Sequence, residues 1–247
     1  MPEAKVALVT GAGRGIGRDI ALRLAHEGFA VGLIARTKSQ LDETAELIRA
    51  KGGKAAVTPT DVSRRDQVLA AVATVERELG PISVLINNAG AYLRKRFTEI
   101  TEEEFDFQLK VNAYGPFYVT QAVIGKMAER GAGTVIFVLG SESRGGPAQY
   151  SAYNASKLAQ RAIAESAAYE FMHLGVHAAA LDIDGAVDSP RVRESMPETD
   201  PLQFVPPGAI CDEIEHLINQ PKSAWTFQAD LRSFAQWRPR AAAKKKA

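Results

Sequence analysis

The stretch TGAGRGIG, residues 10–17, joins two segments of different pattern. Residues 5–10 (KVALVT) form a short apolar run, which is typical of a strand buried on both faces. Residues 15–27 carry apolar side chains at helical spacing. Glycines at such a junction allow a tight turn and let the backbone approach a pyrophosphate at the positive end of the helix. We therefore predict a dinucleotide-binding loop that contains Thr10, Gly11, Arg14, Gly15, Ile16 and Gly17.

The end of the next predicted strand indicates which dinucleotide binds. NAD-binding proteins usually place Asp or Glu there, where the carboxylate binds the adenosine ribose hydroxyls. This sequence has Arg36 followed by Thr37, so a guanidinium is available for a 2′-phosphate. Arg14 in the glycine loop offers a second positive charge. The pattern favours NADP over NAD, and the alternative interpretation is that both arginines are ordinary surface residues.

Strand-like and helix-like segments alternate along the rest of the chain. This alternation predicts right-handed crossovers and a parallel sheet covered by helices on both faces. We therefore expect a doubly wound α/β fold of the Rossmann type. Its seven strands are predicted at residues 5–10, 30–35, 55–59, 82–86, 134–139, 177–183 and 224–230. Helices are predicted at 15–27, 38–51, 64–79, 102–130, 151–174 and 208–219.

A single catalytic domain is expected over residues 1–235. Within it, residues 185–207 are rich in Pro, Asp and Ser, which predicts a substrate loop or lid. Residues 236–247 form a basic, low-complexity tail that has too little apolar surface to order itself.

Composition argues against several other classes of protein. The 247 residues include 30 basic and 29 acidic side chains, so no global charge favours nucleic acid or an acidic membrane. No apolar run is long enough to span a bilayer, and no signal-peptide pattern opens the chain. A single cysteine, Cys211, fits a reducing compartment, so we expect a cytoplasmic protein. No metal site is predicted, because the four histidines lack ligand spacing: His26, His173, His177 and His216.

Three further motifs follow the glycine turn in order: NNAG at 87–90, a serine at 141 and YNASK at 153–157. In this order and spacing the sequence resembles the short-chain dehydrogenase/reductase family, in its short single-domain subgroup. The resemblance covers roughly residues 5–189. It implies an oxidoreductase that interconverts a carbonyl and an alcohol on a small molecule, and a homodimer or homotetramer.

The chemistry centres on Tyr153 and Lys157, which stand four residues apart and so share one face of a helix. A free tyrosine titrates near pH 10, and a neighbouring ammonium favours its phenolate. Tyr153 can then act as general acid in reduction and as general base in oxidation. The resemblance implies that Lys157 also holds the nicotinamide ribose.

Two more catalytic roles come from the resemblance. Ser141, twelve residues before the tyrosine, would polarise the substrate carbonyl, and Ser143 is the competing candidate. Asn112 would hold a water in a proton relay with the lysine, and its alternative role is a helix kink. Tyr150 lacks a lysine four residues later and is expected to line the substrate pocket.

The remaining cofactor contacts are also implied by the resemblance. Asp61 and Val62 match the pair that contacts adenine, and Asn88, Ala89 and Gly90 would lie beside the adenosine ribose. Gly185 would lie near the nicotinamide.

The sequence departs from the family pattern at two places. Asp184 stands where a proline is usual, which puts a carboxylate near the cofactor, and Ser189 replaces a usual threonine. The ending AWTFQADLRSFAQW replaces a glycine-rich segment, so the family's role for this region does not transfer.

Two questions remain open from the residues alone. The run Arg94-Lys95-Arg96 near the expected substrate entrance could steer an anionic substrate such as an acyl carrier thioester, or it is a solvated charge run. The alternative to an active enzyme is a catalytically weak nucleotide-binding or scaffold protein of the same fold.

Overall fold

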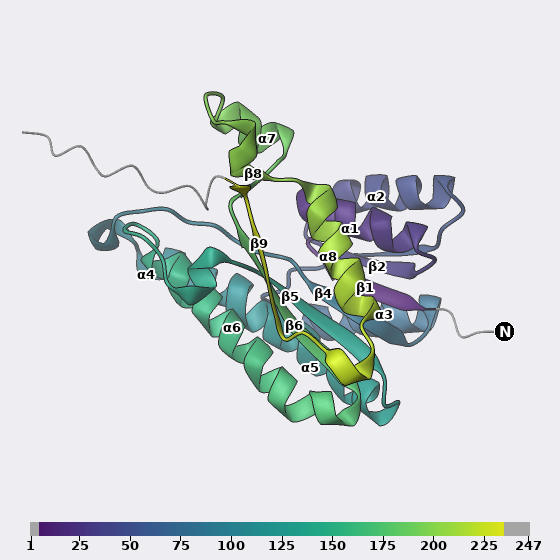
Figure 1. Ribbon diagram of the computed structural model, residues 1–247. Coiled ribbons are helices and arrows are strands. Elements are labelled where there is room, and N and C mark those ends of the chain that lie inside the picture. The colour runs from purple at the N-terminus through teal and green to yellow at the C-terminus, as the bar shows by residue number, and fades with distance from the viewer. Residues whose placement is uncertain (1–4, 235–247) are drawn as a thin grey trace, which may run out of the picture.

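The computed structural model describes residues 5–234, without the side chains of residues 142, 190 and 191. Seven strands form its central sheet: β1 (Val6–Thr10), β2 (Ala30–Ala35), β3 (Ala55–Pro59), β4 (Ile82–Asn87), β5 (Gly133–Gly140), β6 (Val176–Asp184) and β9 (Gln228–Arg232). All neighbours pair in parallel, in the order β3-β2-β1-β4-β5-β6-β9 (Figure 1). The order reverses direction between β1 and β4, and in such sheets ligands bind outside the carboxyl ends of the strands at this point.

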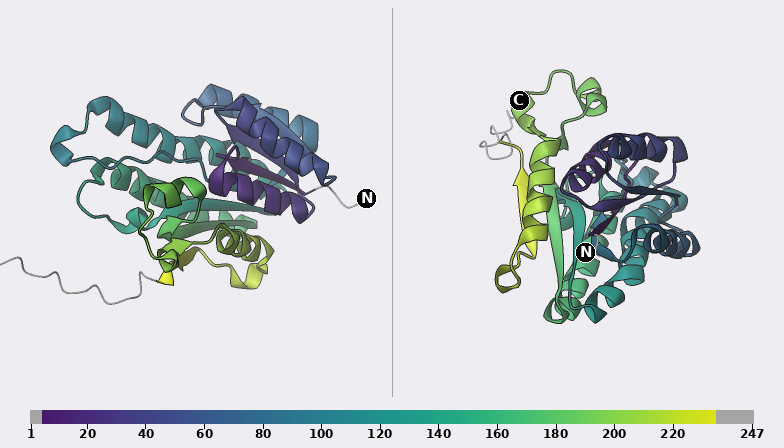
Figure 2. Two further views of the ribbon diagram at one scale, coloured as in Figure 1. Left: turned by 90° about the horizontal axis from the view of Figure 1, so that it is seen from above. Right: turned by 90° about the vertical axis from the view of Figure 1, so that its right-hand side faces the viewer.

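Helices cover both faces of the sheet, as Figures 1 and 2 show. One layer contains α1 (Gly15–His26), α2 (Lys38–Ala50) and α8 (Pro207–Asn219). The other contains α3 (Arg65–Leu79), α4 (Glu102–Leu109), α5 (Gly115–Glu129) and α6 (Ser151–Phe171). This arrangement confirms the predicted doubly wound fold.

Strand β1 shows how the sequence builds two cores at once. Successive side chains of a strand point to opposite faces, so Val6 and Leu8 enter one apolar core while Ala7 and Val9 enter the other. All four side chains are fully buried. An unbroken apolar run is therefore what a central parallel strand requires.

Two predicted elements have different bounds in the structure. The helix expected over 102–130 is interrupted by a π-helical turn, Lys110–Tyr114, between α4 and α5. The last strand lies at 228–232 rather than 224–230. The ring of Trp225 stacks on His177 with the ring centres 5.0 Å apart.

The segment 185–207, predicted as a loop or lid, has secondary structure of its own. Strands β7 (Ala186–Val187) and β8 (Phe204–Val205) pair in parallel, and α7 (Pro190–Ser195) lies between them in the chain. Figure 2 shows this segment standing clear of the layered body. Within the described residues no helix is long and apolar enough to cross a membrane. The predicted basic tail, 236–247, lies outside the described residues.

Candidate active site

The glycine loop links β1 to α1 at the point where the strand order reverses. Gly11 and Gly15 have φ angles of +70° and +54°, which side-chain-bearing residues rarely adopt. A Cβ on Gly17 would overlap the carbonyl oxygen of Gly11 and lie 2.5 Å from Nδ2 of Asn88. One on Gly15 would meet nothing within 4 Å, so this backbone faces open space at the start of α1. Such an exposed, side-chain-free helix start fits a dinucleotide pyrophosphate.

Thr10 and Asn88 fasten the ends of β1 and β4 to each other. The hydroxyl of Thr10 accepts from the backbone N–H groups of Asn88 and Ala89, both at 3.0 Å, and donates to the carbonyl of Ile86 at 3.2 Å. Nδ2 of Asn88 donates back to the Thr10 carbonyl at 2.9 Å. Both side chains are therefore engaged in shaping the loop, and Ile16 follows in the first turn of α1.

Residues outside the predicted site brace the same loop. Arg18 donates from Nη2 to the carbonyl of Gly13 at 2.8 Å, and Thr44 of α2 donates to the carbonyl of Ala12 at 3.1 Å. A Cβ on Gly13 would lie 3.0 Å from the side chain of Gln40. The sequence offered no signal for this support, because Thr44 is 32 residues from its partner.

Arg14 and Arg36 are both exposed beside the glycine loop and the end of β2. Among the side chains that the structure describes, neither arginine has a carboxylate partner within ion-pair distance. Two unneutralised guanidinium groups at this edge fit a phosphate on the adenosine ribose. Thr37 is the N-cap of α2, and Ala35 ends the strand where a carboxylate would be needed for the usual NAD contact.

The pair predicted to contact adenine follows β3. The carboxylate of Asp61 accepts from the N–H and hydroxyl of Ser63, at 2.9 and 2.8 Å, and so shapes the start of α3. Val62 is buried and would contact a Cβ on Gly115 at 2.9 Å. The side chain of Asp61 is thus held by the turn that follows β3. The backbone of Asp61 and Val62 lies just beyond the carboxyl end of that strand.

Tyr153 and Lys157 lie one turn apart on α6, and the ammonium is 6.0 Å from the centre of the tyrosine ring. Lys157 is only 5% exposed, so its charge sits in a site with little water. Its Nζ donates to Oε1 of Gln160 at 2.9 Å and to the carbonyl of Val138 at 3.3 Å. Gln160 is fully buried, and sequence reasoning missed it because a glutamine three residues after a lysine carries no distinctive signal.

Asn112 lies fully buried in the π-helical turn and faces the loop that follows β4. Its Oδ1 accepts from the N–H of Ala91 and its Nδ2 donates to the carbonyl of Ala91, both at 2.8 Å. Nδ2 also donates to the hydroxyl of Ser156 at 2.9 Å. A Cβ on Gly90 would lie 3.4 Å from Oδ1 of Asn112 and 3.9 Å from Nζ of Lys157. The structure therefore brings Asn112, Gly90 and Lys157 together.

The two candidate serines lie in the turn Ser141–Arg144 that follows β5 and packs against α6. Ser143 is fully buried, and its hydroxyl forms a short hydrogen bond with the carboxylate of Asp182. Burial raises the pKa of that carboxyl. Ser141 is half-buried at the carboxyl end of β5. The competing serine, Ser143, therefore has a buried carboxylate as its hydrogen-bond partner.

Asp184 belongs to a charged ladder on β6 and β9. Asp182 pairs in register with Asp230, and Asp184 with Arg232. The carboxylate of Asp184 lies 3.9 Å from Arg144 and 3.7 Å from Arg232, and Arg144 also forms an ion pair with Asp230. The negative charge that replaces the usual proline is therefore matched by two guanidinium groups. Gly185 follows with φ +142°, a conformation that suits glycine.

Two other tyrosines gather around the Tyr153 ring. Tyr150 lies beside Tyr153 with ring centres 6.5 Å apart. Tyr92, which the sequence did not single out, approaches Tyr153 to 5.3 Å. In the part of the chain that the structure describes, no group of three or more His, Cys, Asp or Glu side chains could hold a metal ion.

A parallel Rossmann sheet with a Tyr–Lys pair beside the loop that follows β4 is typical of a nucleotide-dependent oxidoreductase. The short chain dehydrogenase family model matches residues 5–199, and the chain belongs to this family. It is 40% identical to gluconate 5-dehydrogenase of Gluconobacter oxydans over 149 residues, which cover 59% of this chain and 58% of that protein.

Solved structures match over nearly the full length. An alcohol dehydrogenase from Thermococcus sibiricus complexed with 5-hydroxy-NADP superposes with a TM-score of 0.86 and 30% identity, covering 97% of this chain and all of that one. NAD⁺-bound xylitol dehydrogenase superposes with a TM-score of 0.85 and 25% identity, covering 94% of this chain and all of that one. Relatives of this fold therefore bind either dinucleotide.

Proposed function

We propose that this oxidoreductase interconverts a carbonyl and an alcohol with NADP(H), and that Tyr153 is its general acid and base. The observation that carries the proposal is the buried ammonium of Lys157, 6.0 Å from the Tyr153 ring and next to Gly90. A positive charge in a site with little water favours the phenolate of a neighbouring tyrosine. The two residues thus supply a proton donor that is usable near neutral pH.

The bound nicotinamide supplies or accepts the hydride when it is present. In the direction of reduction, Tyr153 donates its proton to the carbonyl oxygen, and in oxidation it removes the proton from the alcohol. Ser141 donates a hydrogen bond to the same oxygen and stabilises the charge that develops there. Lys157 stabilises the phenolate, and Gln160 and the Val138 carbonyl keep its ammonium in place.

Asn112 supports this site in two ways. It fixes the loop that contains Gly90 and Ala91 through its paired hydrogen bonds to Ala91. It also joins that loop to α6 through Ser156, whose hydroxyl donates to the carbonyl of Tyr153 at 2.7 Å. We assign Asn112 to the proton relay with Lys157 that the family resemblance implies.

The choice of NADP rests on Arg36 and Arg14. Both guanidinium groups are exposed at the edge where the adenosine ribose would lie, and no described carboxylate neutralises them. Ala35 occupies the place of the carboxylate that repels a 2′-phosphate in NAD-specific proteins. Thr10, Gly11, Gly15, Ile16, Gly17, Asn88 and Ala89 would form the rest of the cradle, with Asp61 and Val62 near the adenine.

We further propose a homo-oligomer in the cytoplasm. Exposed aromatic side chains gather on α4, α5 and the π turn between them, where Phe105, Tyr114 and Phe117 are each at least 40% exposed. Such a patch is rarely left in water when a second copy can cover it. Size-exclusion chromatography with light scattering tests this, and a monomer at micromolar concentration would contradict it.

The decisive experiment follows NADPH absorbance with purified protein across ketones, aldehydes, quinones and oxoacyl thioesters. Tyr153→Phe should abolish turnover and leave the Kd for NADPH within about twofold, since the phenol's proton is lost while its ring remains. Tyr169→Phe, the same change at an exposed tyrosine of the same helix, is the matched control and should retain activity. A Tyr153→Phe enzyme with most of its activity would overturn the mechanism.

A further inference from the structure

Two loops meet beside the ring of Tyr153. One follows β4 and contains Tyr92 and Arg94, and the other precedes α6 and contains Gln149 and Tyr150. The hydroxyls of Tyr92 and Tyr150 are hydrogen-bonded at 2.9 Å, and the two rings pack edge to face with centres 5.9 Å apart. The two loops are therefore joined through their tyrosines at the substrate side of the site.

Gln149 makes the second connection between these loops. It has φ +75°, and among the described non-glycine residues it alone has a positive φ angle. Its carbonyl accepts from the N–H of Lys95 at 2.8 Å, and its Oε1 accepts from Nε of Arg94 at 3.1 Å. A left-handed non-glycine residue is strained and persists only when its surroundings impose it. The position of Arg94 is thus built by both loops.

Arg94 and Lys95 differ in whether a described carboxylate neutralises their charge. Lys95 forms an ion pair with Glu104 at 2.8 Å, which neutralises it. Among the described side chains, the partners of Arg94 are uncharged: Gln149 and the ring of Tyr150, whose centre lies 5.8 Å from the guanidinium carbon. Among the side chains that the structure describes, no acceptor faces the terminal nitrogens of Arg94.

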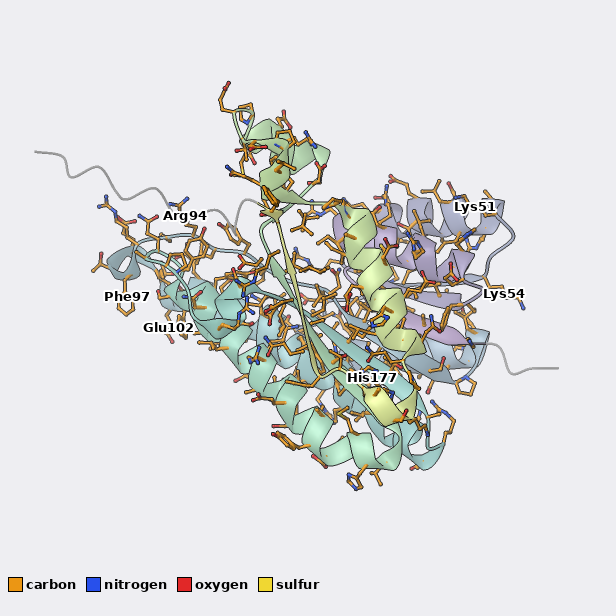
Figure 3. The ribbon with its side chains drawn as sticks, in the orientation of Figure 1. Lys51, Lys54, Arg94, Phe97, Glu102 and His177 are labelled. Atoms are coloured by element: carbon orange, nitrogen blue, oxygen red, sulfur yellow. The ribbon has the colours of Figure 1, made fainter. Side chains whose placement is uncertain are left out.

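A guanidinium held by neutral groups keeps its full charge and its fork of terminal N–H donors. This fork matches a carboxylate or a phosphate in two parallel hydrogen bonds. Figure 3 shows Arg94 at the outer edge of the loop that leads into α4. The ring of Tyr150 neighbours both Arg94 and the ring of Tyr153, at 5.8 and 6.5 Å, so the guanidinium and the phenol belong to one cluster.

We propose that Arg94 binds an anionic group of the substrate, at a distance of several bonds from the carbonyl that Tyr153 protonates. This assignment rests on the proposed function, because it places the reacting carbonyl at Tyr153. The substrate class is then a carbonyl compound or alcohol with a remote carboxylate or phosphate, rather than a neutral ketone.

The test compares charged and neutral forms of the same compound. Levulinate and methyl levulinate differ by the charge of a group two methylenes away from the ketone. For the parent enzyme, kcat/KM should be about tenfold or more higher with levulinate, as a charge-assisted hydrogen bond provides. Arg94→Gln should remove this preference and leave kcat/KM for the ester within about twofold.

Arg96→Gln is the matched control, since Arg96 is an exposed arginine two residues away with no described side-chain partner. It should keep the preference for the acid. Both variants could instead lose the preference for levulinate equally, and the difference from the parent enzyme could vanish in high salt. The charged run 94–96 would then act by general electrostatic steering, and the site at Arg94 would be refuted. An ester that reacts as well as the acid in the parent enzyme also refutes the proposal.

A second pair identifies the source of the anion. Acetoacetyl-coenzyme A carries phosphates, whereas the N-acetylcysteamine thioester of acetoacetate is neutral. If Arg94→Gln impairs the coenzyme A thioester alone, a phosphate is the bound anion; if it impairs levulinate alone, a carboxylate is.

A binding measurement separates this proposal from the proposed function. NADPH-loaded Tyr153→Phe protein should bind levulinate in calorimetry, and the Tyr153→Phe, Arg94→Gln double variant should bind it at least about tenfold more weakly. If the ester is reduced and Tyr153→Phe abolishes that reduction, the proposed function stands even where the Arg94 proposal fails. Equal binding of levulinate by the two variants would show that Arg94 takes no anion.

Discussion

The side chain of Asn112 pairs with the backbone of Ala91 through two hydrogen bonds of 2.8 Å, one donated and one accepted. The two residues are 21 positions apart, and their pairing imitates one rung of a sheet. It ties the π-helical turn to the loop after β4, and this loop carries both Gly90 beside Lys157 and Tyr92 beside Tyr153. One buried amide thus fixes the loop that contacts both Lys157 and Tyr153.

Asn112→Leu should destabilise the protein and impair catalysis. The substitution keeps the volume but leaves the N–H and carbonyl of Ala91 without their partner, at a cost of about 1–3 kcal/mol each when they stay buried. Thermal unfolding should show a lower Tm, and kcat should fall more than the affinity for NADPH. Asn112→Asp retains the acceptor for the Ala91 N–H and should be the milder change in Tm. An Asn112→Leu protein with the parent Tm and kcat would mean that the pairing contributes nothing.

Gly17→Ala should weaken cofactor binding strongly, because the new Cβ would overlap the carbonyl oxygen of Gly11. The loop must move to relieve this contact, and overpacking of this kind costs about 1–3 kcal/mol. Gly125→Ala is the matched control in α5, where a Cβ meets nothing within 4 Å. Alanine favours a helix more than glycine does, so the Tm of the Gly125→Ala variant should rise slightly. Fluorescence titration with NADPH and thermal melts check both. Equal behaviour of the two variants would contradict the packing argument.

Arg36→Ala should reduce the preference for NADPH over NADH. Loss of a charge-assisted contact to the 2′-phosphate raises the Kd for NADPH by about tenfold, whereas NADH lacks that phosphate and should be little affected. Arg77→Ala removes an exposed arginine in the last turn of α3 and serves as control. If the parent protein binds NADH as tightly as NADPH, the assignment of NADP is wrong.

Arg144 should matter for kcat through the turn that carries Ser141. Its ion pair with Asp230 ties this turn to β9, 86 residues further along the chain. Arg144→Gln and Asp230→Asn should each lower kcat about fivefold or more, and the double variant should be no worse than the poorer single one, as expected for one shared interaction. The exposed pair Arg64 and Asp66, at 3.5 Å, is the control. Arg64→Gln and Asp66→Asn should each leave kcat unchanged. Strictly additive losses would contradict a direct pairing.

Much of the site could be predicted because its signals are local. The glycine turn is defined by adjacent residues. Tyr153 and Lys157 share one face of the helix because residues four apart lie one above the other in an α-helix. The run of apolar residues in β1 likewise shows a strand buried on both faces before any partner is known.

Other features could not be predicted because they depend on residues far apart in the chain. Thr44 of α2 donates to the carbonyl of Ala12, 32 residues earlier, and Arg144 forms an ion pair with Asp230, 86 residues later. The contact of Ser143 with the buried carboxylate of Asp182, on the neighbouring strand and 39 residues away, likewise depends on the fold.

The sequence by itself determined the doubly wound fold, the family and the residues of the predicted catalytic centre, since periodicity and short motifs depend on neighbours in the chain. Only the tertiary structure decided how charges are matched. Asp184 meets Arg144 and Arg232, Lys95 meets Glu104, and Arg94 is held by Gln149 and Tyr150 without a carboxylate. Electrostatic energies depend on distance and burial in space, and a linear sequence contains neither.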